Sequence, residues 1–113
     1  MKKLMILLCL SIILFAGCDI LTPPQVEYEI SGTATSVNIT YSNASEGTSQ
    51  VSDVSVPWTY SFESTTGNFL YVSAQNQNDS GSLTATIYVD GDVYKTSTSS
   101  GAYVIATASG SAP

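Results

Sequence analysis

The chain reads Leu83-Thr84-Ala85-Thr86-Ile87-Tyr88-Val89-Asp90-Gly91 in its C-terminal third, and this segment is the clearest indication of the fold class. Its apolar residues alternate with Thr and Tyr, a period of two that is typical of a half-buried β-strand. Asp90-Gly91 directly after the strand is the strongest short-range hairpin signal in the chain, because both residue types suit a two-residue turn. We therefore expect residues 93–98 to return antiparallel beside this strand.

Alternating segments of the same kind recur along the chain. They are residues 26–30, 37–41, 58–62, 69–74 and 103–108, with turn residues at 32, 43–47, 66–68, 75–81 and 99–101. Residues 51–56 alternate imperfectly, which predicts a bulge or an irregular edge, and Pro57 predicts an edge or a strand break. Seven to eight short strands predict an all-β fold, an antiparallel β-sandwich, with a small closed barrel as the alternative. We expect Trp58 to anchor the core between the sheets.

The N-terminus carries the features of an export signal. Two lysines follow the initiator methionine, residues 4–15 are almost wholly apolar, and the segment ends with Leu14-Phe15-Ala16-Gly17-Cys18. This ending resembles the lipobox of bacterial lipoproteins, which implies diacylglycerol on the Cys18 thiol and cleavage between Gly17 and Cys18. The apolar run is shorter than the roughly 17–20 residues of a membrane-spanning helix. An uncleaved anchor and a secreted protein with a buried Cys18 thiol are the alternatives.

These features divide the chain into four parts. We expect a lipoprotein signal peptide over residues 1–17, a lipidated Cys with a short tether over 18–25, one β-sandwich domain over 26–109 and a frayed C-terminus over 110–113. At about 3.3 Å per residue, the tether keeps the domain close to the extracytoplasmic face of an envelope membrane. Asp19 resembles the inner-membrane retention signal of enteric bacteria. Because that rule varies between lineages, the choice of inner or outer membrane stays open.

The charge balance excludes two classes of partner. Of the three basic residues, Lys2 and Lys3 leave with the leader, so Lys95 alone faces nine acidic residues. One cation cannot neutralise a phosphate backbone, which excludes nucleic acid, and it cannot form a basic patch for anionic lipid. The chain has no His, and its two cysteines, Cys9 and Cys18, lie in the leader and the lipobox. We therefore expect no disulfide, metal, cofactor or catalytic residue, and a solvated Lys95.

Two features could nevertheless bind a ligand. Asp90 and Asp92 flank Gly91, and paired carboxylates bind calcium, but Asp is also a favoured turn residue and the remaining ligands of a calcium loop are not visible. Seven Tyr residues and one Trp could line a sugar-binding face, but both types are also ordinary strand residues. A glycan or calcium site is therefore the alternative to purely structural roles.

Four segments of the predicted domain carry a family resemblance. They are Val26-Glu27-Tyr28-Glu29-Ile30-Ser31-Gly32, Val37-Asn38-Ile39-Thr40-Tyr41, Pro57-Trp58 and Ile87-Tyr88-Val89-Asp90-Gly91. Together they resemble the MmpS family, small mycobacterial membrane proteins that accompany MmpL transporters of the RND class. The resemblance implies an immunoglobulin-like β-sandwich outside a membrane that serves as an accessory or assembly partner. It also implies a transmembrane helix where this chain has its lipobox, and a Cys pair where this chain has Ala85 and Ala106, two small residues that can pack between the sheets instead.

Two hypotheses about function follow. The first is a lipid-anchored, non-catalytic interaction or transport-accessory module that binds an envelope protein, for example an RND-type transporter. The second is a surface lipoprotein that binds a glycan or calcium through exposed Tyr residues or the turn from Asp90 to Asp92. An envelope enzyme is a third class, which no residue pattern in the sequence supports.

Overall fold

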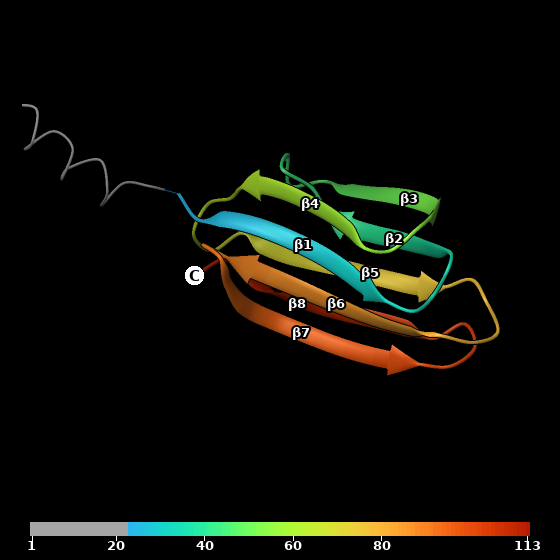
Figure 1. The fold of residues 1–113 in the computed structure, drawn as a ribbon. Coiled ribbons are helices and arrows are strands. Elements are labelled where there is room, and N and C mark those ends of the chain that lie inside the picture. Colours follow the sequence, from blue (N-terminus) through green and yellow to red (C-terminus); the bar gives the residue numbers. More distant parts are fainter. Residues whose placement is uncertain (1–22) are drawn as a thin grey trace, which may run out of the picture.

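The structure, a computed structural model, describes residues 23–113. These residues form eight β-strands arranged in two layers that lie face to face (Figure 1). The strands are β1 (Gln25–Gly32), β2 (Val37–Ser42), β3 (Thr48–Val54), β4 (Trp58–Glu63), β5 (Phe69–Asn76), β6 (Ser82–Val89), β7 (Asp92–Ser100) and β8 (Ile105–Ser111). Each layer is a separate four-stranded sheet with antiparallel pairing. The predicted β-sandwich is confirmed, and the closed barrel is not formed.

The strand order brings distant segments of the chain together. Sheet A has the order β4-β1-β6-β7, and sheet B has the order β3-β2-β5-β8. The expected hairpin joins β6 to β7: Val89 pairs with Asp92 across Asp90-Gly91, whose φ angles of 52° and 86° are those of a two-residue turn with both positions left-handed. The expected irregularity in residues 51–56 is also present, as a register shift between β2 and β3.

The alternation of residue types directs one face of each central strand into the space between the sheets. The buried apolar residues of sheet A are Val26, Tyr28, Ile30, Leu83, Ala85, Ile87 and Val89, and those of sheet B are Val37, Ile39, Tyr41, Leu70, Val72, Ala74, Ala106 and Ala108. Burial of apolar surface, at about 25 cal/mol per Å², is the main stabilising contribution in such a core. The two sheets therefore hold each other together through their inner faces.

The two lateral sides of the sandwich are closed differently. On one side β7 lies against β8 (Figure 1), and side chains bridge the sheets. The Tyr94 hydroxyl donates to the carbonyl oxygen of Ser111 at 2.6 Å, and the Ser99 hydroxyl donates to that of Ile105 at 2.8 Å. On the other side, at β4, aromatic side chains fill the space.

Trp58 belongs to this aromatic side. It is partly buried and packs against Tyr41, with the ring centroids 5.2 Å apart. Tyr28 is the central aromatic residue instead: it is fully buried, and its ring contacts those of Tyr41, Tyr60 and Phe62. Because β4 is an edge strand, Trp58 covers the rim of the core and does not reach its centre.

The two ends of the sandwich carry different loops. The N-terminal end holds the start of β1, residues 64–68, the Asp90-Gly91 turn and the C-terminus (Figure 1). The distal end holds the connections at 33–36, 77–81 and 101–104, which hydrogen bonds join to one another. At its centre is Asn76, a buried residue whose side-chain amide donates to the carbonyl oxygens of Ser80 and Gly101 at 2.8 and 3.1 Å. The distal end is therefore a single cross-linked cap.

Three expected boundaries are wrong. Residues 110–113 are not frayed, because β8 continues to Ser111 and Ala112 is buried, with its N–H donating to the Asn68 carbonyl oxygen at 2.8 Å. The predicted tether over 18–25 ends early, because Pro24 is buried and accepts a hydrogen bond from the Ser64 N–H at 2.9 Å. Tyr103, expected in a strand, lies in a turn with a φ of 54°. In each case hydrogen bonds to distant residues fix a segment whose own sequence is a weak signal.

Candidate functional site

The predicted anchor, with Gly17, Cys18 and Asp19, lies outside the described residues. Among the residues that the structure does describe, no helix has the length and apolar character needed to cross a bilayer. The structure shows instead how the chain enters the domain. The Gln25 N–H donates to the Asp90 carboxylate at 3.0 Å, and the Asp90 N–H donates to the Gln25 carbonyl oxygen at 2.8 Å. The first strand is thus clamped at its first residue.

This clamp gives Asp90 a structural role. Its carboxylate accepts from Gln25, and its left-handed backbone forms the first position of the hairpin turn. Within residues 23–113, no three Cys, Asp or Glu side chains are grouped so that they could hold a metal ion. Asp90 thus forms the first position of the turn, and Asp92 begins β7 beside it.

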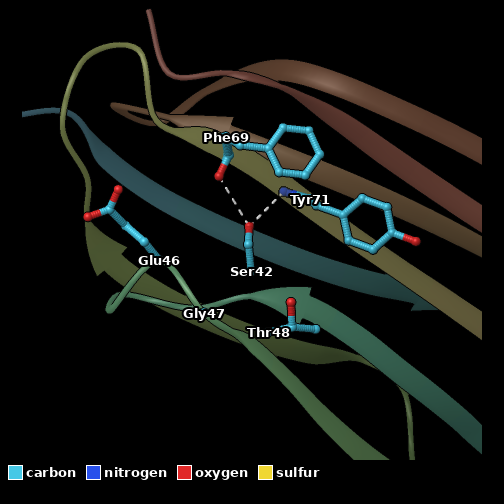
Figure 2. Close-up of a pocket in the computed structure, with 6 residues that line it drawn as sticks. All are labelled: Ser42, Glu46, Gly47, Thr48, Phe69 and Tyr71. Atoms are coloured by element: carbon cyan, nitrogen blue, oxygen red, sulfur yellow. Dashed lines mark hydrogen bonds between the residues drawn. The ribbon is translucent and has the colours of Figure 1, made fainter.

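A pocket of about 370 Å³ opens on the outer face of sheet B. It is lined by Ser42, Glu46, Gly47, Thr48, Phe69 and Tyr71. In Figure 2, Phe69 and Tyr71 extend from one strand, Thr48 comes from another, and Ser42 lies between them. The order β3-β2-β5 in sheet B places these residues side by side although they are distant in sequence.

Phe69 and Tyr71 form the aromatic wall of the pocket. They are two residues apart on β5, so both side chains point to the outer face of the sheet. Their ring centroids lie 5.9 Å apart, with 28° between the ring planes. Phe69 is 63% exposed, whereas the core residues of β5 are fully buried. The pair therefore contributes little to the core and forms a surface feature.

The loop between β2 and β3 places Glu46 on the other side of Ser42 from the two rings (Figure 2). Asn43 organises this loop: its side-chain oxygen accepts the N–H groups of Ser45 and Gly47 at 2.9 and 3.1 Å. Glu46 itself has a left-handed backbone, with a φ of 65°, and its N–H donates to the Asn43 carbonyl oxygen at 3.1 Å. The Glu46 side chain is exposed and lines the pocket.

Ser42 is the floor of the pocket. Its hydroxyl accepts the Tyr71 N–H at 3.0 Å and donates to the Phe69 carbonyl oxygen at 3.3 Å (dashed lines in Figure 2). The Tyr28 hydroxyl reaches the same point from the core and donates to the Ser42 carbonyl oxygen at 2.9 Å. Burial raises the pKa of Tyr28 above its ordinary value of 10.0, and the hydrogen bond with Ser42 opposes this shift. The backbone of Phe69 and Tyr71 is therefore held in place by Ser42, which is itself hydrogen-bonded to Tyr28 in the core.

Only the aromatic residues of this pocket could be expected from the sequence. Tyr71 is among the residues considered for a sugar-binding face, and Phe69 lies on the same side of the predicted strand. Glu46 and Thr48 carry no local signal, because they join the aromatic pair only through the order of the strands in sheet B. Tyr28, also among the tyrosines, is buried in the core and supports the pocket from beneath.

A comparison with known protein families covers most of the chain. The family model described as Mycobacterium membrane protein matches residues 11–109. The chain belongs to this family. The MmpS-like resemblance is thereby confirmed, and it supports a membrane-associated accessory role in a family that is not known for catalysis. Among proteins with curated descriptions, none matches the chain in sequence.

Ala85 and Ala106 stand at the positions where the resemblance to the Mycobacterium membrane protein family implies a Cys pair. Both are fully buried. Ala85 lies on β6 and Ala106 on β8, two strands that contact each other across the sandwich. Small side chains therefore pack between the sheets at these positions, as expected from the sequence.

Proposed function

We propose that the chain is a lipid-anchored, non-catalytic accessory protein of the cell envelope, held by diacylglycerol on Cys18 and facing the extracytoplasmic side. Its domain binds an envelope protein, and the family resemblance suggests an RND-type transporter. Membership of the Mycobacterium membrane protein family supports the membrane association. The lipobox-like Leu14-Phe15-Ala16-Gly17-Cys18 supports the mode of attachment.

The main structural support for this proposal is the set of hydrogen bonds that fixes the chain where it enters sheet A. Pro24 is hydrogen-bonded to Ser64, Gln25 is hydrogen-bonded to Asp90, and β1 then runs between β4 and β6. From Cys18 to Pro24 the chain can span about 20 Å at most. A lipid on Cys18 would therefore hold the N-terminal end near the bilayer and direct the distal end away from it.

The distal end offers a surface for the partner. Tyr103 is 57% exposed and Ile105 is 54% exposed, and both lie on or beside the cap that Asn76 cross-links. Exposed aromatic and aliphatic side chains on a rigid backbone are typical anchors of protein interfaces. We therefore place the partner contact at Tyr103 and Ile105.

Comparing Cys18→Ala with Cys9→Ala tests the anchor, because Cys9 lies within the predicted leader and only Cys18 directly follows the small residues Ala16 and Gly17. We expect Cys18→Ala to leave the membrane fraction or to accumulate as an uncleaved precursor. Cys9→Ala should be processed and anchored like the parent. Each buried CH₂ of the lipid contributes about 0.8 kcal/mol, so two or more chains hold the protein stably. A Cys18→Ala protein that is still cleaved and anchored would overturn the anchor.

Photocrosslinking in the native envelope tests the partner. The full chain carries p-benzoylphenylalanine in place of Tyr103, and in a matched control in place of Thr66, an exposed residue at the N-terminal end. We expect a discrete adduct with an envelope protein from position 103, identified by mass spectrometry, and no such adduct from position 66. Absence of an adduct from position 103, or the same adduct from both positions, would contradict the proposed contact.

A further inference from the structure

The pocket on sheet B has no part in the proposed anchor or partner contact, and its composition is that of a ligand site. It combines an exposed aromatic pair, Phe69 and Tyr71, with Glu46 and Thr48 on neighbouring segments. We infer that this pocket binds carbohydrate, with an uncharged sugar ring lying against Phe69 and Tyr71. This inference stands independently of lipidation and of a protein partner.

The aromatic pair offers the apolar surface that a sugar ring needs. The faces of aromatic rings carry partial negative charge, whereas the C–H groups on one face of a pyranose are apolar and slightly positive. With centroids 5.9 Å apart, Phe69 and Tyr71 form one continuous surface. The Ser42 hydroxyl holds the backbone of both residues, so little ordering is required on binding.

Polar groups of the pocket can hold the sugar hydroxyls. Glu46 and Thr48 are exposed and line the pocket, so the Glu46 carboxylate and the Thr48 hydroxyl are accessible to a ligand. A carboxylate can accept from two adjacent sugar hydroxyls, and a Thr hydroxyl can both donate and accept. The volume of about 370 Å³ lies within the range of about 300–1,000 Å³ that is usual for small-ligand sites.

Charge restricts the ligand to a neutral one. The chain has a net charge of −6, Glu46 lines the pocket, and Lys95 lies on β7 in the opposite sheet. A phosphate or carboxylate would be repelled by Glu46, and the residues that line the pocket include no Lys or Arg. These conditions exclude nucleotides and acidic sugars and favour neutral pyranosides.

The same sugar ring could come from two sources. One is a polysaccharide of the cell envelope. The other is the headgroup of a glycolipid, which a domain held close to a bilayer would meet; this second source rests on the proposed anchor.

Titration calorimetry of the full chain tests the inference with cellohexaose, maltohexaose, mannohexaose and chitohexaose. The protein is kept in a polyoxyethylene detergent, which has no sugar headgroup. We expect saturable binding of at least one oligosaccharide. Phe69→Ala and Tyr71→Ala should each weaken it at least about tenfold, as loss of stacking does in other aromatic platforms. Glu46→Gln should weaken it by a smaller factor, because one acceptor oxygen remains.

Val93→Ala is the matched control, since it truncates an exposed apolar side chain on β7, outside both the pocket and the proposed partner contact. It should bind like the parent, and circular dichroism should show that all four variants remain folded. Repeating the titration in dodecyl maltoside distinguishes the sources: displacement of the oligosaccharide indicates a glycolipid headgroup, and unchanged binding indicates a polysaccharide. No heat with any of the four oligosaccharides, or binding that survives both Phe69→Ala and Tyr71→Ala, would overturn the inference.

Discussion

The Tyr28 hydroxyl crosses the sandwich and donates to the carbonyl oxygen of Ser42 at 2.9 Å. Tyr28 starts from β1 at the centre of sheet A, and Ser42 ends β2 in sheet B. The same hydroxyl lies 3.0 Å from the Ser42 hydroxyl and 3.4 Å from the Tyr71 N–H. One buried side chain therefore joins the two sheets by hydrogen bonding beneath the outer pocket.

Tyr28→Phe should remove this connection while keeping the ring in the core. A buried hydrogen bond contributes about 1–2 kcal/mol, and the Ser42 carbonyl would lose its donor from Tyr28. We expect the free energy of unfolding in urea to fall by about that amount. Tyr103→Phe, which alters an exposed hydroxyl, should change it by less than about 0.5 kcal/mol. Equal effects of the two substitutions would show that the Tyr28 hydroxyl adds no stability.

The raised pKa of Tyr28 predicts sensitivity to alkali. Burial disfavours the phenolate, so the pKa in the folded state lies above the value of 10.0 expected when the chain is unfolded. The protonated Tyr28 hydroxyl therefore contributes its full stabilisation of the folded state below pH 10, and this stabilisation is lost as the pH rises through the raised pKa. Urea titrations between pH 8 and 11 should show stability falling at the alkaline end, with a shallower fall in Tyr28→Phe. Parallel pH profiles of the two proteins would refute the prediction.

Gly32 and Gly67 both have positive φ, 133° and 92°, but their surroundings differ. A Cβ at Gly32 would overlap the Ser82 carbonyl group, with the Ser82 carbonyl carbon 2.8 Å away, whereas a Cβ at Gly67 would meet no atom within 4 Å. Gly67→Ala should therefore cost only the backbone strain, about 1 kcal/mol. Gly32→Ala should cost about 3 kcal/mol or more, because β1 and β6 must also move apart. Thermal unfolding of both variants measures the difference, and similar melting temperatures would exclude a close contact at Gly32.

Asp90 should act through its geometry and not through a bound ion. Asp90→Asn keeps an acceptor for the Gln25 N–H and suits a left-handed backbone, so we expect a change in stability within about 0.5 kcal/mol. Asp90→Ala loses the acceptor and should cost about 1 kcal/mol. Adding calcium should leave the melting temperature of the parent unchanged. A calcium-dependent rise that disappears in Asp90→Asn would assign the turn to metal binding instead.

The fold was predictable from the sequence where the signal is local. Strict alternation around Ile87 and the turn at Asp90-Gly91 specify a strand and a hairpin without knowledge of any other segment. Asn76 was not predictable in this way. It lies in a polar stretch that predicts a loop, yet it is fully buried. Its burial is possible because its side-chain amide donates to the carbonyl oxygens of Ser80 and Gly101, which lie outside the local strand signal. Ala112 is similar, since its hydrogen bonds come from residues 67 and 68.

The pocket was less predictable than the fold, for a related reason. The spacing of Phe69 and Tyr71 indicates that both side chains point to the same face of the strand, and the sequence alone makes the tyrosines candidates for sugar contact. Nothing in the sequence near Glu46 indicates that its loop lies beside β5. That proximity follows from the pairing of β2 with both β3 and β5, which is decided by packing of the whole core.

The position of β1 has a mechanical consequence. Tension on the segment before Gln25 would act along a strand that is hydrogen-bonded to β4 on one side and β6 on the other. Both rows of hydrogen bonds would be loaded together in shear and would have to break at once, whereas an edge strand could peel away one bond at a time. The domain is thus built to resist being pulled apart from its N-terminus.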